Sequence, residues 1–315
     1  MNTPANTLVV PIYRNASSIA VLVETIANIA TQVNGGLEAI FVIDGSPDDS
    51  SARLQDALLP GLVDARIIEH SRNFGAFAAI RTGMSVARGH YIAVMAADLQ
   101  EPPELVVTFL NRLAAGNVDV VAGQRKSRND RNDGLAKLYW MLYRRFVLAE
   151  IPPGGVDVFA CTAPVRDVVC ALEDVHTSLV AQLFWVGFRR ELVPYDRLPR
   201  AGESGWTLRR KFRYLSDSVF AFTELPVRLL WLVGLAGMTL GAALGATVLV
   251  TRITGAITVP GYATTILILL FFLSLNSLGL GIIGSYVWRA YDTIKRRPGA
   301  IVRDVIEIPK RQVDV

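Results

Sequence analysis

Two long stretches without a charged side chain, both in the last third of the chain, restrict its possible folds most strongly. Residues 229–250 carry no charge, and after the single Arg252 residues 253–288 carry none either. A helix needs about 20 apolar residues to cross the hydrocarbon core of a bilayer. We therefore expect two transmembrane helices within residues 226–290, joined by a short turn at residues 254–261. The alternative is a pair of buried helices in a large soluble protein.

The charges beside these stretches predict their orientation. Basic residues are frequent before the first stretch and after the second: Arg209, Arg210, Lys211, Arg213, Arg228, Arg289, Lys295, Arg296 and Arg297. Under the positive-inside rule both flanks face the cytoplasm, which predicts a multi-pass protein of the inner (plasma) membrane whose other domains are cytoplasmic. Glycines at G-x-x-x-G spacing, at positions 237, 241 and 245, allow close contact between helices of one hairpin or of neighbouring copies.

Composition agrees with a membrane-bound chain. Its hydrophobic fraction of 51% and mean hydropathy of +0.36 exceed those of an ordinary soluble protein. The net charge of +4 comes largely from the flanking basic residues, which anionic lipids would attract. No basic stripe with interleaved aromatic residues occurs, which disfavours nucleic-acid binding. Cys161, Cys170 and the scattered histidines form neither a zinc pattern nor a disulfide framework, and residues 1–12 lack the features of a signal peptide.

The first 122 residues alternate between short apolar runs and longer helical patterns. Strands are expected at residues 8–12, 38–43, 66–70, 91–95 and 118–122, and helices at residues 16–33, 48–58, 76–87 and 104–115. This alternation predicts an α/β fold with a mostly parallel sheet and helices on both faces. Near the end of the chain, residues 301–315 alternate like a strand, which we expect to pair with a sheet edge of the same or a neighbouring subunit.

Ligands of such sheets bind beyond the carboxyl ends of the strands. The first strand is not followed by a G-x-G-x-x-G motif, which disfavours a dinucleotide-dependent dehydrogenase, and no Walker A motif occurs. Two other strands end in an acid, Asp44 and Asp98. Asp98 and Gln100 can turn to one cation, because Mg²⁺ and Mn²⁺ take carboxylate and amide oxygens. The alternative for Asp98 is a turn or helix-capping acid.

Six motifs resemble those of the family 2 glycosyltransferases, and within them the polyprenyl-phosphate (undecaprenyl or dolichyl phosphate) sugar transferases. They are VPIY at 10–13, VIDGSPD at 42–48, SRNFG at 71–75, ADLQEPPE at 97–104, GQR at 123–125 and RAGES at 200–204. The resemblance covers nearly the whole chain. It implies a GT-A (Rossmann-like) catalytic domain over residues 1–205, an interfacial helix at residues 206–225, a transmembrane hairpin at residues 226–290 and a cytoplasmic tail at residues 291–315.

The resemblance also implies roles for single residues. Asp98 and Gln100 look like metal ligands, and Asp157 matches the acid proposed in the family as catalytic base. An ordinary turn aspartate is the alternative for Asp157. The residues expected to bind the nucleotide-sugar donor are Pro11, Tyr13, Asp44, Asp98, Arg200 and Ser204.

Arginines follow the fifth expected strand. The planar guanidinium of Arg125, Arg128 and Arg131 suits phosphate. The next segment, residues 135–148, is apolar with several aromatic side chains, which are frequent at the membrane–water interface. We therefore expect an acceptor-phosphate site at the membrane edge, the alternative being a solvated basic loop.

The resemblance implies an inverting, Mg²⁺- or Mn²⁺-dependent transfer of a sugar to undecaprenyl phosphate at the cytoplasmic membrane face, with UDP-glucose as the favoured donor. It also suggests a homo-oligomer such as a tetramer. Three positions depart from the family pattern: Ile43 and Ala96 replace acids, and Gly205 replaces a lysine. These departures keep a second hypothesis open, a catalytically silent membrane subunit that binds nucleotide-sugar or lipid phosphate.

Overall fold

The computed structural model describes residues 4–58, 63–126, 141, 144–145, 150–152, 156–172, 178–197, 225–254, 261–295 and 297–308. The chain divides into two compact units. Met1–Phe212 and Pro298–Val315 form the first, and Arg213–Arg297 form the second. In the described residues the first unit is an α/β domain, and the second consists of two helices.

An eight-stranded sheet forms the centre of the first unit, in the order β7-β5-β6-β4-β1-β2-β3-β8. The strands are β1 (Asn6–Ile12), β2 (Leu37–Ile43), β3 (Asp64–His70), β4 (Tyr91–Val94), β5 (Val120–Arg125), β6 (Phe159–Thr162), β7 (Arg190–Tyr195) and β8 (Val302–Ile308). Strands β1 to β4 run parallel, as do β5 and β7. Only β6 and β8 run against their neighbours in this sheet. The mostly parallel α/β sheet predicted from the sequence is thereby confirmed.

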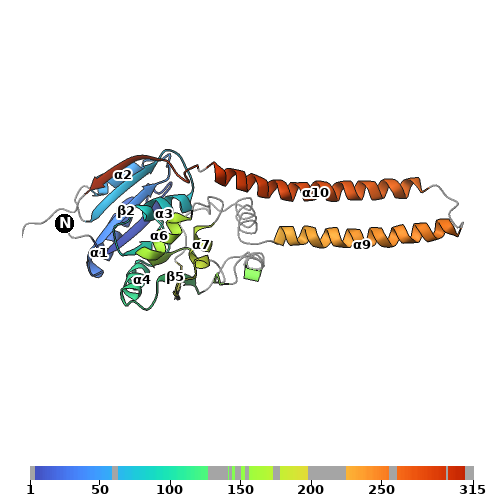
Figure 1. The fold of residues 1–315 in the computed structure, drawn as a ribbon. Helices are drawn as coiled ribbons and strands as arrows, with labels where there is room; N and C mark the ends of the chain where they lie inside the picture. The colour runs from blue at the N-terminus through green and yellow to red at the C-terminus, as the bar shows by residue number, and fades with distance from the viewer. Residues whose placement is uncertain are drawn as a thin grey trace, which may run out of the picture. The chain divides into compact units, whose positions relative to one another are not determined.

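In the described residues, six helices accompany the sheet, as the ribbon in Figure 1 illustrates. They are α1 (Ile19–Gln32), α2 (Ser50–Leu58), α3 (Ala76–Ser85), α4 (Pro103–Ala114), α6 (Ala163–Ala171) and α7 (Leu179–Trp185). Helix α1 begins at Ile19, later than the expected residue 16. The cause is a turn in which the Ser18 amide donates to the Asn15 carbonyl oxygen over 2.9 Å.

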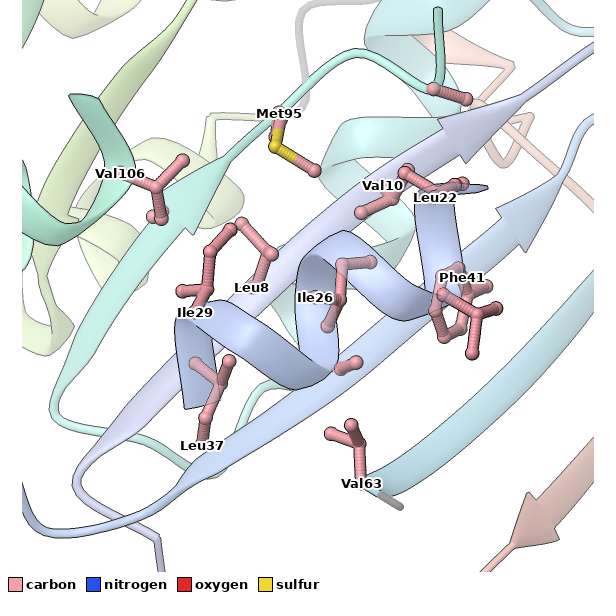
Figure 2. Packing of buried hydrophobic residues seen from close by; sticks show 14 of the residues in the cluster. Leu8, Val10, Leu22, Ile26, Ile29, Leu37, Phe41, Val63, Met95 and Val106 are labelled. Carbon is pink, nitrogen blue, oxygen red and sulfur yellow. The ribbon is translucent and has the colours of Figure 1, made fainter. Parts of the chain in front are cut away.

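The core lies on both faces of the buried strands. Leu8 and Val10 of β1 point to one face, where Leu22 and Ile26 of α1 pack in the same cluster (Figure 2). The opposite face is covered by α3, where Gly83 permits close approach: a Cβ at this position would lie 2.4 Å from Val9 Cγ1. Since neighbouring residues of a strand face opposite ways, this arrangement requires β1 to be apolar on both faces from Leu8 to Ile12. Packing on both faces holds these strands in place, and this determines where their carboxyl ends lie.

The second unit contains α9 (Leu225–Ile253) and α10 (Tyr262–Ile294), which run side by side (Figure 1). In the described part of the chain one stretch, Phe271–Ile294, is long and apolar enough to cross a membrane. The predicted two-span hairpin therefore stays a prediction. Close glycine packing is not seen at the glycines whose surroundings are described: a Cβ on Gly279 would meet Leu230 at 3.6 Å, an ordinary contact distance, and one on Gly281 would meet nothing within 4 Å.

The strand expected in residues 301–315 lies at the edge of the sheet in the same chain. It is β8, which pairs antiparallel with β3. The Ser71 amide donates to the Ile301 carbonyl oxygen over 2.9 Å, and Arg303 forms an ion pair with Glu69. The segment that follows α10 therefore completes the sheet of the first unit.

Candidate active site

The topology of the sheet gathers the predicted site residues at one edge. The carboxyl ends of β1, β2, β4, β5 and β7 point the same way, and β6, which runs in the opposite direction, begins there. Tyr13, Asp44, Asp98, Arg125 and Asp157 follow or precede these strand ends. This edge, called the strand-end edge below, is where an open α/β sheet binds its ligands.

Asp44 is held by donors of its own chain. Its Oδ1 accepts from His70 Nδ1 over 2.9 Å and from the Phe74 amide over 2.8 Å, and Oδ2 accepts from the Gly75 amide over 2.7 Å. Burial alone would raise the pKa of Asp44, but these hydrogen bonds outweigh it and lower the pKa. The carboxylate is 2% exposed. The Asp44 carboxylate therefore fixes the start of α3, and its expected contact with the nucleotide stays a prediction.

His70 was not singled out by sequence reasoning. The ring is buried at the end of β3, and its Nε2 lies 3.0 Å from Thr82 Oγ1 of α3. The sequence signal is a histidine at the end of the expected strand RIIEH at residues 66–70. His70 connects Asp44 to α3.

The loops after β1 and β2 interlock beside Asp44. Gly45 has a φ of +56°, and a Cβ there would lie 2.3 Å from the Arg72 carbonyl carbon, so no other residue fits without a shift. Ser46 Oγ accepts from the Arg14 amide over 2.8 Å and donates to Asp48 over 2.6 Å. These bonds explain in physical terms why the VIDGSPD motif has its glycine, serine and aspartate.

The two donor-site residues predicted near the end of β1 differ in exposure. Pro11 is half-buried within β1, whereas Tyr13 is 41% exposed. The Tyr13 amide donates to Asn15 Oδ1 over 3.1 Å, and the Arg14 guanidinium lies 5.4 Å from the Tyr13 ring centre. Tyr13 therefore presents an aromatic ring to solvent at the strand-end edge.

Asp98 and Gln100 lie in a strained turn after β4. Leu99 between them has a φ of +53°, and the Gln100 amide lies 3.4 Å from Asp98 Oδ1. Asp98 is half-buried and Gln100 is 4% exposed. No group of three His, Cys, Asp or Glu ligands occurs among the described residues. A carboxylate and an amide still suit Mg²⁺ or Mn²⁺, because such ions bind to one or two carboxylates and complete their shell with substrate phosphates and water.

Arg125, Asp157 and Tyr195 form a connected group. Arg125 ends β5, and its guanidinium is ion-paired with Asp157, which precedes β6. The Tyr195 hydroxyl at the end of β7 donates to Asp157 Oδ2 over 3.2 Å. Burial, followed by the charge of Asp157, raises the pKa of Tyr195 to about 12, so the phenol keeps its proton. We expected Arg125 to follow the fifth strand, at residues 118–122. This position is wrong, because Arg125 is the last residue of β5.

Glu101 and Arg197 form a second pair, which sequence reasoning missed. Glu101 Oε1 lies 3.3 Å from Arg197 Nε, and the Glu101 residue is 1% exposed. Burial raises the pKa of Glu101 to about 7; Arg197 opposes that shift, and the charges of Asp157 and Asp98 add to it. The signal for Glu101 was the acid within ADLQEPPE, whereas Arg197 belongs to no motif.

Several residues that the sequence analysis singled out lie in parts of the chain that the structure does not describe. Arg128, Arg131, Arg200, Ser204 and Gly205 lie outside the described residues, as do residues 206–224 of the expected interfacial helix. Of the other two departures, Ile43 is 3% exposed in the core cluster, where a carboxylate would lack water. Ala96 is half-buried just after β4.

Comparisons with known proteins indicate the family of the chain. The family model described as glycosyl transferase family 2 matches residues 7–170. An uncharacterized glycosyltransferase of Synechocystis is 30% identical over 303 residues, which cover 95% of this chain and 94% of the relative. The undecaprenyl-phosphate 4-deoxy-4-formamido-L-arabinose transferase of Pseudomonas fluorescens is 27% identical, with coverages of 95% and 89%.

Two further matches complete the comparison. A prophage bactoprenol glucosyl transferase homolog of Escherichia coli is 25% identical and covers 95% of this chain and 98% of its own length. Among solved structures, a mannosyltransferase from Pyrobaculum calidifontis in complex with GDP-Man and Mn²⁺ has 16% identity and a TM-score of 0.46, with coverages of 92% and 88%. The family match and the full-length relatives agree with the motifs, and the protein belongs to the family 2 glycosyltransferases.

Proposed function

We propose that this glycosyltransferase moves glucose from UDP-glucose to undecaprenyl phosphate at the cytoplasmic face of the inner membrane. The observation that carries the proposal is the strand-end edge, where Asp98, Arg125 and Asp157 converge. The choice of acceptor is supported by relatives named for bactoprenol or undecaprenyl phosphate that align over 95% of the chain. The choice of glucose is supported by the bactoprenol glucosyl transferases among them.

The proposal includes a membrane hairpin formed by α9 and α10. Support comes from the charge-free residues 229–250 in α9 and from Phe271–Ile294 in α10. Near the end of α10, Lys295 Nζ lies 4.9 Å from the ring centre of Trp288 and 4.2 Å from that of Tyr291. An aromatic pair under a lysine fits the membrane–water interface. A homo-oligomer, such as a tetramer, remains part of the proposal.

Asp98 and Gln100 would hold Mg²⁺ or Mn²⁺ together with phosphate oxygens of the donor. When bound, the cation neutralises the charge that develops on the departing diphosphate. The turn around Leu99 supports this assignment, because it places a carboxylate and an amide two residues apart at the strand-end edge.

The proposed transfer is a single displacement at the anomeric carbon. A phosphate oxygen of the lipid forms the new bond to that carbon, while the bond to UDP breaks and its electron pair leaves with the diphosphate, which inverts the configuration. The lipid phosphate carries roughly −1.5 to −2 charges at neutral pH and needs no base. Asp157 would therefore orient Arg125 and the acceptor, and Arg125 would contribute positive charge.

A donor screen tests the function. The purified full-length protein is incubated with undecaprenyl phosphate, Mn²⁺ and, in separate reactions, UDP-glucose, UDP-galactose, UDP-N-acetylglucosamine or GDP-mannose, and the lipid is analysed by mass spectrometry. We expect a product one hexose heavier with UDP-glucose, and its loss with EDTA or in the Asp98→Asn variant. Absence of a glycosylated lipid with all four donors would contradict the proposal.

One observation favours a second candidate, a silent subunit that binds nucleotide-sugar or lipid phosphate. Ala96 stands where the family has an acid. Calorimetry with UDP-glucose separates the two functions. Binding that is independent of Mn²⁺, in a protein without turnover, would support the silent subunit.

A further inference from the structure

Glu101 is a buried carboxylate to which the proposed reaction gives no role. Neither of its oxygens accepts a hydrogen bond from the described residues. Its ion-pair partner in that part of the chain is Arg197, whose Nε lies 3.3 Å from Oε1. A buried carboxylate without hydrogen bonds is costly, and natural proteins keep such groups where they have a function. The pair therefore calls for a functional explanation.

The two members of the pair differ in exposure. The Glu101 side chain is 2% exposed, and that of Arg197 is 27% exposed. Arg197 follows the end of β7 by two residues, so it lies at the strand-end edge. Glu101 thus holds Arg197 from inside the protein, while part of the Arg197 side chain is exposed at the strand-end edge.

Two arginines near this point favour an anionic ligand. The Nε atoms of Arg125 and Arg197 are both buried and have no hydrogen-bond acceptor among the described residues. Each arginine has a carboxylate counterion, Asp157 for Arg125 and Glu101 for Arg197. A guanidinium offers five N–H donors in a planar fork, and a carboxylate leaves some of them for a second acceptor. Phosphate oxygens match these donors in charge and geometry.

We propose that Arg197 binds a phosphate oxygen of a substrate and that Glu101 is a positioning residue that holds Arg197 for this contact. The inference rests on the proposed function. The ligand chemistry is a phosphate oxygen, which both the nucleotide diphosphate and the lipid phosphate monoester supply. Glu101 contacts no substrate, because it is buried, and acts through Arg197.

The test compares Arg197→Gln, Glu101→Gln and the double variant in the full-length enzyme. Each variant is assayed with UDP-glucose varied at saturating undecaprenyl phosphate, and then with the lipid varied. We expect Arg197→Gln to raise the KM of one substrate about tenfold or more, the loss typical of a charge-assisted hydrogen bond. A rise for UDP-glucose identifies the diphosphate, and a rise for the lipid identifies the monoester.

The effect of Glu101→Gln distinguishes positioning from general support of the fold. We expect it to raise the same KM and the double variant to be no worse than Arg197→Gln alone, because the two residues act as one unit. The matched control is Arg189→Gln. Arg189 lies just before β7, at the opposite edge of the sheet, and the substitution breaks its ion pair with Asp119. This control should leave both KM values within about twofold of wild type.

Three results would overturn the inference. One is an Arg197→Gln enzyme whose two KM values match wild type, and another is a Glu101→Gln enzyme with a lower melting temperature but unchanged KM. The third is a double variant in which the two effects multiply.

If the wild type shows no turnover, the proposed function fails. Calorimetry with UDP and with undecaprenyl phosphate in micelles then tests whether Arg197 binds a phosphate oxygen. Tenfold weaker binding of either by Arg197→Gln supports the inference, and equal or absent binding overturns it.

Discussion

At the scale of single residues, three carboxylates at the strand-end edge have three different environments. Asp44 accepts hydrogen bonds from its own chain, Asp157 is 34% exposed and paired with Arg125, and Glu101 is buried beside Arg197. The end of an expected strand identified Asp44 as a candidate, and the family resemblance identified Asp157. It could not predict their environments or the partner of Glu101, because those partners lie on strands far away in sequence.

Tyr195 offers a test of the group around Asp157. Tyr195→Phe removes the hydroxyl that donates to Asp157 and keeps the ring in place. We expect kcat to fall roughly tenfold, since the bond involves a charged acceptor, with the melting temperature nearly unchanged. The control is Tyr91→Phe at the start of β4, at the opposite edge of the sheet. Equal activity of the Tyr195→Phe variant and wild type would show that the hydroxyl does not help orient Asp157.

Glu38 on β2 predicts how stability depends on pH. Burial would raise the pKa of Glu38, but hydrogen bonds from Thr7 and Arg88 lower it from its ordinary value of 4.5. A group with a lowered folded pKa stabilises the protein above the unfolded pKa, and this contribution is lost as the pH falls through the folded pKa. Glu38→Gln should therefore destabilise the protein by about 1–3 kcal/mol at pH 7.

The same variant should lose less additional stability than wild type when the pH falls below 4.5. Thermal melts followed by near-UV circular dichroism at a series of pH values measure both effects. Glu24→Gln on the exposed face of α1 is the control. Parallel curves for wild type and Glu38→Gln would contradict the assignment.

At the scale of elements, the sequence predicted the first half of the sheet within a few residues. Apolar runs and helical periodicity identified each strand from β1 to β5 and each helix from α1 to α4. Strands β6 and β7 were not predicted. β6 has four residues, FACT, too few for a periodic pattern, and its place between β4 and β5 depends on long-range pairing. Tyr195 and Arg197 were missed as site residues because their position depends on the end of β7, which was not predicted.

The edge strand β8 can be tested with two neighbouring residues. Ile306 packs against the core, whereas Val305, which points the other way, is 49% exposed. Ile306→Asp should lower stability by about 1–3 kcal/mol, because it places a charge against apolar side chains. Val305→Asp should stay within about 0.5 kcal/mol of wild type. Thermal melts decide, and equal effects of both substitutions would show that β8 does not use one face for packing.

At the scale of the whole molecule, the helical unit is an insertion in the α/β unit. The first unit takes in both Met1–Phe212 and Pro298–Val315, so the chain leaves it before α9 and returns after α10. The two charge-free stretches of the sequence and their basic flanks predicted a hairpin whose two ends lie on one side of the membrane. That prediction needs a membrane for its test, because helix length alone does not show what surrounds a helix.

Cysteine labelling tests the hairpin in intact cells. Gly261 precedes α10, and Gly299 follows it. With a membrane-impermeant maleimide, Gly261→Cys should be labelled from outside the inner membrane, whereas Gly299→Cys should be labelled only after the membrane is broken. Of the native cysteines, Cys161 is buried and Cys170 is half-buried, so labelling of the protein without a new cysteine gives the background. Labelling of both positions, or of neither, before lysis would contradict a hairpin with cytoplasmic ends.

The order of elements along the chain has a consequence for biosynthesis. Strand β8 is encoded after α10, yet it pairs with β3, which is made near the beginning. A ribosome must release both long helices before the nascent enzyme can acquire its eighth strand. Pairing of β8 with β3 therefore takes place after α9 and α10 have been synthesised.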